Sequence, residues 1–346
     1  MIYVDGVPFS SKSASSSQGG DTVLALLENP ILASASASFN GISVHNYSVS
    51  QETESRTPSQ QKCVYVFQRE YATVDPALVD FVGTDEATTC VALVIRNRRS
   101  GMTSVAHMDS PKVVDIGLKQ MLTLLVDKDS HDELDVHLVG GFDDASNQKN
   151  ISGKKRGTIA KPDGYSFPLC AKIILSLQQN RRSFNILTFH VLGNNTRCNA
   201  DGHPVPIFHG LLVDTSSGSV MAATFDRSTR CPDELIRRIR VSASFEDPRW
   251  KGKLLDTYHT QTDRFNIAPC SWSNHLLHIA SSVMNLSDSE ILLSCSTSPF
   301  AESPDFVDNE RRLFNYLLHS PDWKDTFPMN QSRVYKRNSD GGWIRC

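Results

Sequence analysis

Residues 90–107 read Cys-Val-Ala-Leu-Val-Ile-Arg-Asn-Arg-Arg-Ser-Gly-Met-Thr-Ser-Val-Ala-His, and this stretch decides the expected fold. An apolar, β-branched run at 91–95 and a strand-like run at 102–106 flank a polar, turn-prone segment at 97–101. Two such runs joined by a short polar turn are typical of an antiparallel β-hairpin. We therefore predict a hairpin whose open end carries the first and last residues of the stretch.

Those two residues are a thiol and an imidazole. If the turn is centred between Arg98 and Arg99, Cys90 and His107 lie directly opposite each other. Opposed residues of an antiparallel pair share a face, with Cβ atoms about 5 Å apart, so a hydrogen bond between thiol and ring is within reach. Taken singly, such a cysteine is more often a small buried hydrophobe and such a histidine a structural one. Together they predict a nucleophile with its base, in which a neighbouring imidazolium lowers the pKa of the thiol.

The composition limits the classes of protein that the chain can represent. Its 346 residues are 39% hydrophobic and 21% charged, as in a globular protein of one or two domains. A net charge of -3 gives no general attraction to nucleic acid. No apolar stretch approaches the roughly 20 residues that span a bilayer, and no signal-peptide pattern is present. We expect a cytoplasmic monomer without nucleic-acid or membrane partners. The basic run 154–156 is interpreted as a solvated loop, with nuclear import as the alternative.

The cysteines follow no disulfide or metal-binding pattern. Eight of them are scattered without a repeated spacing, which in a chain of this size indicates reduced, mostly structural thiols. The sequence contains neither a zinc-ligand spacing nor a glycine-rich phosphate cradle. We therefore expect no metal and no other cofactor.

The chain is expected to hold one folded catalytic domain. Residues 1–60 are rich in Ser, Gly, Gln and Thr and predict a partly flexible region with one short helix near 21–27, capped by Asp21. A single α/β domain is expected over 61–346, with an exposed, polar insertion at about 143–164.

Within that domain, helices and strands alternate without a strict βαβ rhythm. Helices are predicted from Pro111 and around 170–177, 287–295 and 306–317, and strands at 134–138, 184–191, 207–213 and 220–225. This pattern predicts a mixed α/β (α+β) fold. We expect a layered, largely antiparallel sandwich with helices packed outside the sheets, similar to an αββα arrangement.

Polar groups gather on both sides of the predicted dyad. The loop 83–89, Gly-Thr-Asp-Glu-Ala-Thr-Thr, supplies hydroxyls and carboxylates just before Cys90. Such a loop can donate backbone N–H groups to an oxyanion, orient a histidine, or merely cap a strand. Asp109 follows His107 by two positions, so on a continuing strand it shares the face of the histidine and could hold a cation.

Four separated motifs resemble the protein N-terminal asparagine amidohydrolase family. They are Gly-Thr-Asp-Glu-Ala-Thr-Thr-Cys at 83–90, His-Leu-Val-Gly-Gly-Phe-Asp at 137–143, Ser-Trp at 271–272 and Ser-Thr-Ser-Pro-Phe-Ala-Glu at 296–302. The resemblance runs from about residue 65 to residue 343. It implies hydrolysis of the side-chain amide of an N-terminal asparagine, in the branch of protein degradation that reads N-terminal residues. One departure is Met-Asp-Ser at 108–110, where the family pattern has Cys-Asp-Gly, so a role that needs glycine at Ser110 is in doubt.

The resemblance assigns roles to individual residues. Cys90 would be the nucleophile and His107 its base. A more distant similarity to bacterial chemotaxis glutamine deamidases, which carry a threonine six positions before the cysteine, makes Thr84 the candidate that orients the histidine. The expected substrate-binding residues are Asp109 and Glu302 for the α-ammonium group, with the hydroxyl-bearing Thr88, Thr89 and Ser298 around them.

Some alternatives stay open at this point. Asp85 and Glu86 are alternate carboxylates for the ammonium, and backbone N–H groups near residues 88–90 are expected to hold the oxyanion. The chain could instead be a module that binds N-termini without hydrolysing them, or a deamidase of internal glutamine in folded proteins.

Overall fold

The computed structural model describes residues 1–9, 19–47, 61–126, 132–145 and 163–346. Most of the predicted insertion at 143–164, the N-terminal segments 10–18 and 48–60 and the basic run 154–156 lie outside these ranges.

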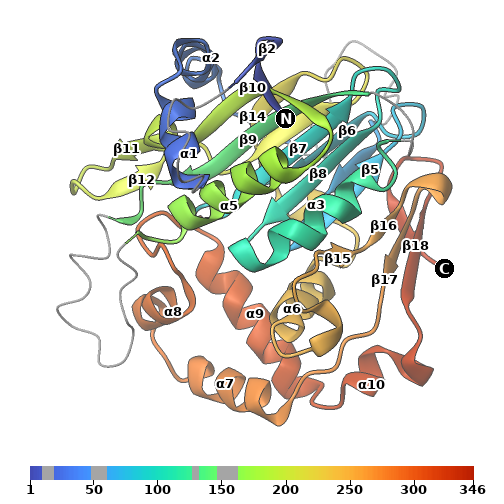
Figure 1. The fold of residues 1–346 in the computed structure, drawn as a ribbon. Coiled ribbons are helices and arrows are strands. Elements are labelled where there is room, and N and C mark those ends of the chain that lie inside the picture. The colour runs from blue at the N-terminus through green and yellow to red at the C-terminus, as the bar shows by residue number, and fades with distance from the viewer. Residues whose placement is uncertain (10–18, 48–60, 127–131, 146–162) are drawn as a thin grey trace, which may run out of the picture.

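The largest element is an eight-stranded mixed sheet that contains the predicted hairpin. Its strand order is β15-β5-β8-β7-β9-β10-β1-β2 (Figure 1). The bounds, in that order, are Leu255–Asp256, Glu70–Val74, Thr103–Met108, Val91–Asn97, Glu133–Phe142, Ser183–Leu192, Ile2–Val4 and Val7–Pro8. The hairpin β7–β8 lies in the interior of this main sheet, between β5 and β9.

A five-stranded sheet faces the main sheet. Its order is β3-β14-β13-β6-β4, with bounds His45–Tyr47, Val220–Phe225, Leu211–Asp214, Phe81–Thr84 and Cys63–Tyr65. Two smaller antiparallel sheets complete the strands: β11-β12 (Thr196–Cys198, Pro204–Pro206) and β16-β17-β18-β19 (Tyr258–His259, Arg264–Ile267, Arg333–Arg337, Trp343–Arg345). The mixed and largely antiparallel layered fold expected from the sequence is confirmed.

The helices form two groups. Three of them, α1 (Gly19–Leu27), α3 (Val114–Leu122) and α5 (Ser166–Gln179), lie across the outer face of the main sheet, and α2 (Pro30–Asn40) packs on β10 (Figure 1). The second group gathers at one end of the two sheets and consists of α6 (Glu234–Ser244), α7 (Asn274–Met284), α8 (Asp288–Cys295), α9 (Phe306–His319) and α10 (Trp323–Thr326). In the described residues, the first group of helices therefore covers the outer face of the main sheet, whereas the second group lies beside the five-stranded sheet.

Alternation along β7 separates two hydrophobic cores. Val91, Leu93 and Ile95 belong to the core beneath the outer helices, whereas Ala92 and Val94 belong to the core between the two sheets. Successive side chains of a strand point to opposite faces. Side chains that share a face with Ala92 are therefore directed toward the second sheet. The polar residues on this face, at the open end of the hairpin, thus lie between the two sheets.

The hairpin register differs from the expected one by two residues. Ala92, not Cys90, is paired with His107, because the turn is longer than predicted. The last strand pair before the turn is Arg96 with Thr103, and beyond it the Met102 carbonyl accepts the Asn97 N–H at 3.0 Å. Gly101 adopts a φ of 74°, which favours glycine. The direct opposition of Cys90 and His107 is therefore wrong. Because the error is an even number, both residues still share one face.

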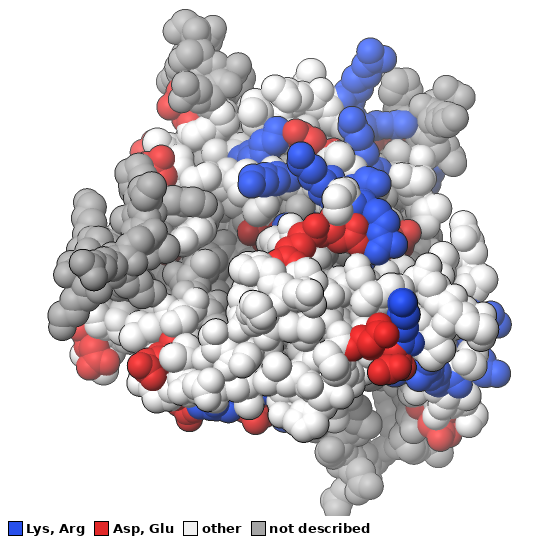
Figure 2. All heavy atoms as spheres, turned by 90° about the horizontal axis from the view of Figure 1, so that it is seen from below, with Lys and Arg blue, Asp and Glu red and all other residues white. Residues whose placement is uncertain are grey.

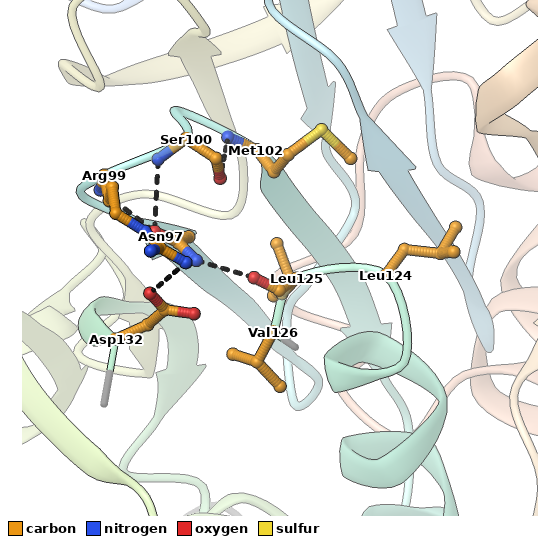
Figure 3. A pocket seen from close by; sticks show the side chains of 8 residues that line it. All are labelled: Asn97, Arg99, Ser100, Met102, Leu124, Leu125, Val126 and Asp132. Carbon is orange, nitrogen blue, oxygen red and sulfur yellow. Dashed lines mark hydrogen bonds and ion pairs between the residues drawn. The ribbon is translucent and has the colours of Figure 1, made fainter. Parts of the chain in front are cut away.

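Side-chain contacts at the turn explain its length. Asn97 Oδ1 accepts the backbone N–H groups of Arg99 and Ser100 at 2.9 and 3.2 Å, and its Nδ2 donates to the Leu125 carbonyl at 2.7 Å (Figure 3). Arg99 pairs with Asp132 at 2.9 Å. These residues line a small pocket at the closed end of the hairpin, together with Met102, Leu124 and Val126. The asparagine thus fixes a turn that residue preferences alone do not specify.

Most predicted elements are present, and several others were missed. The helix expected from Pro111 forms as a short 3-10 turn followed by α3, and Ser287 with Glu290 makes the predicted capping box of α8. The strand predicted to end at Gly140-Gly141 continues through both glycines to Phe142. The sequence predicted one short helix in the N-terminal region, whereas the structure has α1, α2 and the main-sheet strand β1 there. The amphipathic α6 was also missed.

The surface of the described chain carries mixed charge on the face viewed in Figure 2. Basic and acidic side chains lie next to each other near the centre of this view. The C-terminal helices contribute such neighbours as the ion pairs Arg311–Asp288 at 2.6 Å and Arg312–Glu234 at 2.9 Å. In the ranges with described placement, no single helix combines the length and apolar character of a membrane span; only α1 and α2, bent by 64°, do so as a pair.

Candidate active site

Cys90 lies at the end of the loop that leads from β6 of the second sheet into β7 of the main sheet. Its side chain is partly exposed, whereas Thr88 and Thr89 before it are buried. Because Val91 pairs with Met108, the next position outward brings Cys90 alongside Asp109. The thiol therefore lies at the open end of the hairpin, on the face that is directed toward the second sheet.

His107 is held in one orientation by Thr84. The Thr84 hydroxyl, at the end of β6, lies 2.8 Å from Nδ1 of the His107 ring and makes a second, longer contact of 3.5 Å to the Asp85 carbonyl. A hydroxyl that donates to a carbonyl accepts from Nδ1–H, which leaves the Nε2 lone pair free. Nε2 is buried and has no hydrogen-bond partner within the described chain, the Cys90 thiol included. Thr84 therefore fixes the orientation of the ring, while Nε2 makes no hydrogen bond to the described residues.

The electrostatic environment favours an uncharged thiol and an uncharged imidazole. Burial lowers the pKa of His107 to about 4. Burial also raises the pKa of the Cys90 thiol well above its usual value, and the Asp109 and Glu302 carboxylates add to this effect while Arg69 opposes it. The expectation that an imidazolium lowers the thiol pKa is therefore wrong for the free chain. Such a pair acts by transferring its proton during attack rather than as a preformed ion pair.

A second loop closes against the residues before Cys90. It joins α8 to α9 and contains Ser296, Ser298 and Glu302. The Ser298 hydroxyl donates to Thr88 Oγ1 at 2.9 Å, and both serine hydroxyls donate to one oxygen of the Glu302 carboxylate. Burial raises the pKa of Glu302 to about 7. Two motifs that lie some 210 residues apart in sequence thus meet at the candidate site.

Of the four carboxylates considered from the sequence, two are engaged elsewhere. Asp85 accepts hydrogen bonds from the Tyr65 hydroxyl at 2.6 Å and from Arg230 at 3.0 Å. Glu86 pairs with Arg230 at 2.7 Å and with Arg238 at 3.0 Å. These alternates therefore stabilise the loop, and Asp109 and Glu302 are the two carboxylates that act on the Cys90 thiol.

The backbone donors near Cys90 are only partly available. The Thr88 N–H already donates to the Glu86 carbonyl at 3.0 Å, so it is not a candidate oxyanion donor. In the loop before β7, the N–H groups of Thr89 and Cys90 have no hydrogen-bond partner among the described residues. These two adjacent groups remain as candidates.

The departure from the family motif at Ser110 has a local explanation. Its φ is -159°, which is an extended conformation that any residue adopts, so glycine is not required. The Ser110 hydroxyl accepts the N–H of Lys112 at 3.3 Å and caps the helical turn that begins at Pro111. The substitution therefore leaves the path of Asp109 unchanged.

Gly140 lets the strand β9 approach the loop that carries the thiol. A Cβ at this position would lie 2.9 Å from the carbonyl oxygens of both Ala87 and Cys90, and its φ is 103°. Real Cβ atoms do not come that close to backbone oxygens, so any other residue must displace the loop. The sequence motif contained this glycine, but neighbouring strands cannot be inferred from the motif itself.

Replacing Gly140 with alanine is expected to lower activity because the Cys90 backbone must move. We expect destabilisation of about 1–3 kcal/mol from the strained backbone, and a loss of turnover on the order of a hundredfold from misplacement of the thiol. Thermal unfolding and kcat measure the two effects. Gly193→Ala is the matched control, since a Cβ there meets no heavy atom within 4 Å. Full turnover in Gly140→Ala would show that the loop tolerates displacement.

Comparison with known proteins identifies the family of this chain. A family model described as protein N-terminal asparagine amidohydrolase matches residues 53–345. A protein of that name from Arabidopsis thaliana is 53% identical over the full length of both chains. Proteins of the same name from Mus musculus and Homo sapiens are 30% and 28% identical over 82% of this chain and 84% of their own. On this basis the chain belongs to the protein N-terminal asparagine amidohydrolase family.

Proposed function

We propose that this protein hydrolyses the side-chain amide of an N-terminal asparagine in a polypeptide, giving aspartate and ammonia. The observation that carries the proposal is the shared face of Cys90 and His107, with the ring fixed by Thr84 at 2.8 Å. Asp109 and Glu302 supply carboxylates beside the thiol. The names of the relatives support the choice of substrate.

The proposed first half-reaction forms a thioester. The Nε2 atom of His107 accepts the Cys90 proton while the sulfur attacks the carboxamide carbon. The carbonyl oxygen becomes an oxyanion, and we assign its stabilisation to the N–H groups of Thr89 and Cys90. The imidazolium then gives its proton to the leaving nitrogen, so the carbon–nitrogen bond breaks and ammonia departs. Neutral His107 is regenerated for the next step.

The second half-reaction returns the thiol. The same imidazole removes a proton from water, which attacks the thioester carbon. The carbon–sulfur bond breaks, the sulfur takes back the proton, and the side chain leaves as a carboxylate. Each intermediate needs only one base, and the unpaired Nε2 of His107 supports this assignment.

Selection of the first residue of a chain requires a partner for its α-ammonium group. We assign this role to Asp109 and Glu302, with Thr88, Thr89 and Ser298 holding the loop that carries Glu302 against the thiol. Asparagine and glutamine differ by one methylene, and discrimination on that basis is worth about 1–3 kcal/mol. Fixing the ammonium adds to this discrimination, because the longer side chain then places its amide carbon beyond the sulfur.

Peptides that differ only in their first residue test the proposal. We expect ammonia release from the Asn-initiated peptide, and much slower release from the Gln-initiated one. Binding of the Asn-initiated peptide without ammonia release would identify an N-terminus-binding module. Release from a peptide with only an internal glutamine would identify a deamidase of another substrate class.

Acetylating the peptide's N-terminus is expected to reduce kcat/KM by about 10⁴-fold, since the charge-assisted contacts between the ammonium group and the Asp109 and Glu302 carboxylates are then lost. The measurement is ammonia release from matched free and acetylated peptides. An internal control is a peptide whose lysine side chain alone is acetylated. Equal rates with both N-termini would contradict recognition of the ammonium.

The Glu302 carboxyl group predicts a pH dependence of KM. Its pKa is about 7, so it is charged above that pH and neutral below it. The substrate ammonium is attracted only by the charged form, and we expect KM to rise about tenfold per pH unit below 7. Because His107 has a pKa of about 4, it does not protonate in this range. Glu302→Gln should flatten the profile. Glu310→Gln, which removes another buried carboxyl group of pKa about 7, should leave it in place.

From the family resemblance alone, we also propose that the aspartate product feeds the degradation pathway that reads N-terminal residues, and that the protein acts in the cytoplasm. Accumulation of an Asn-initiated reporter in cells that lack this protein would support that role, and normal turnover of the reporter would contradict it.

A further inference from the structure

Arg69 has an unusual backbone that fixes where its side chain begins. It precedes β5 and has a φ of 62°, which is uncommon for a residue with a long side chain. Its N–H donates to the His107 carbonyl at 2.9 Å, and its carbonyl accepts the Leu255 N–H at 2.8 Å. The left-handed conformation therefore persists because the main sheet holds the residue on both sides. No sequence motif marked this position.

The guanidinium group of Arg69 reaches the Asp109 carboxylate between two layers of the protein. Its Nε lies 3.0 Å from Asp109 Oδ2, and the two side chains are 8% and 2% exposed. Its Nη1 donates to the Ser244 hydroxyl at 3.1 Å, and the Phe245 ring covers it with the centroid 3.9 Å from Cζ. Ser244 is the last residue of α6, so a helix of the C-terminal group contributes to the surroundings of this guanidinium.

Arg69 and Asp109 both act on the Cys90 sulfur, with opposite sign. The Asp109 carboxylate raises the pKa of the thiol, and the Arg69 guanidinium lowers it. The strand register gives the geometric reason, because Cys90 comes alongside Asp109 at the open end of the hairpin. His107 and Glu302 also lie at this end, and among the described residues the Arg69 guanidinium pairs with Asp109 and Ser244 rather than with the side chain of either.

We propose that Arg69 is a positioning residue of this site, which holds the Asp109 carboxylate beside the Cys90 sulfur and balances its charge there. The inference rests on the proposed function, in which that carboxylate receives the substrate ammonium. Without the arginine, Asp109 is a buried and unpaired carboxylate, which either takes up a proton or opposes the developing thiolate. Protonation of Asp109 would weaken binding of the substrate ammonium. A charge that opposes the thiolate would slow the attack of the sulfur on the carboxamide carbon.

Site-specific alkylation of Cys90 tests the charge balance directly. Iodoacetamide is uncharged and reacts with the thiolate, so its rate at one fixed pH reports the fraction of thiolate. Peptide mapping by mass spectrometry follows Cys90 alone. We expect Arg69→Met to slow the reaction about tenfold and Asp109→Asn to accelerate it about tenfold, with the double variant close to the native rate. A merely structural role of Arg69 would not give opposite signs.

The kinetic readout separates the role of Arg69 from simple loss of folding. Arg69→Met should raise KM for an Asn-initiated peptide by about tenfold. Arg98→Met is the matched control, because Arg98 also pairs with an aspartate at 2.8 Å but lies at the closed end of the hairpin. It should change neither KM nor the alkylation rate. If Arg69→Met does not fold, Arg69→Lys, which keeps the charge, should retain a near-native alkylation rate while Asp109→Asn still accelerates it.

Two results would overturn the inference: alkylation rates that shift in the same direction in Arg69→Met and Asp109→Asn, or rates that do not shift in either variant. Both differ from failure of the proposed function. That failure would appear as ammonia release by a Cys90 variant, whereas the alkylation rates report on Arg69 whatever the activity of the protein.

Discussion

Replacing Cys90 with alanine is expected to reduce ammonia release from an Asn-initiated peptide by at least about 10⁴-fold, because the covalent route loses its nucleophile. The thiol is partly exposed and makes no hydrogen bond in the described chain, so its loss leaves few contacts unsatisfied. Circular dichroism and thermal unfolding should therefore remain close to native. Cys90→Ser is expected to be nearly as inactive, since a neutral imidazole of low pKa is a poor base for an alcohol.

The matched control for this experiment is Cys198→Ala. Cys198 is exposed on β11, outside the candidate site, and its replacement should leave turnover unchanged. Turnover by Cys90→Ala at more than a few per cent of the native rate would contradict covalent catalysis by this thiol.

Replacing His107 with glutamine is expected to lower kcat by about 10²–10⁴-fold, since it removes the group to which we assign proton transfer in each half-reaction. The effect should fall on kcat, with KM little changed, because the histidine does not hold the substrate ammonium. Thr84→Val should give a smaller loss of about tenfold, because the ring keeps its place but not its tautomer. Steady-state kinetics on one Asn-initiated peptide measures all of these values.

His137→Gln provides a close control for the His107 variant. His137 is also buried in the main sheet, has a pKa lowered to about 4 by burial, and its Nδ1 lies 2.9 Å from the Thr188 hydroxyl. It lies on β9 opposite Val94, deeper in the sheet than the open end of the hairpin. Unchanged kcat in His137→Gln with a large loss in His107→Gln would separate catalysis from burial. Equal losses in both variants would contradict the assigned role.

The sequence specified the face of each residue at the site better than its exact position. The predicted hairpin register placed Cys90 and His107 on one face, and an error of two residues preserves that result. The register itself depended on the Asn97 side chain, which accepts two backbone N–H groups and so lengthens the turn. Such side-chain contacts can select a turn other than the one that the residue types of a short motif favour.

Long-range ion pairs explain which carboxylates were misjudged. Asp85 and Glu86 stood as alternates to Asp109 and Glu302 in the sequence, but Arg230 and Arg238 engage them from more than a hundred residues away. Arg238 lies on α6, whose periodicity was not recognised, and Arg230 lies in the turn before that helix. Arg69 was missed for a related reason, because its partner and its left-handed backbone are both set by neighbouring strands.

The most direct test of the account uses a peptide whose N-terminal residue is an asparagine analogue with a diazoketone in place of the carboxamide. A nucleophile that attacks this group becomes covalently attached as dinitrogen leaves. We predict one label per protein molecule, located on Cys90 by peptide mapping, and no label when the peptide's α-amine is acetylated. Inactivation with the label on another residue, or with Cys90 unmodified, would contradict the central claim that this thiol forms the covalent intermediate.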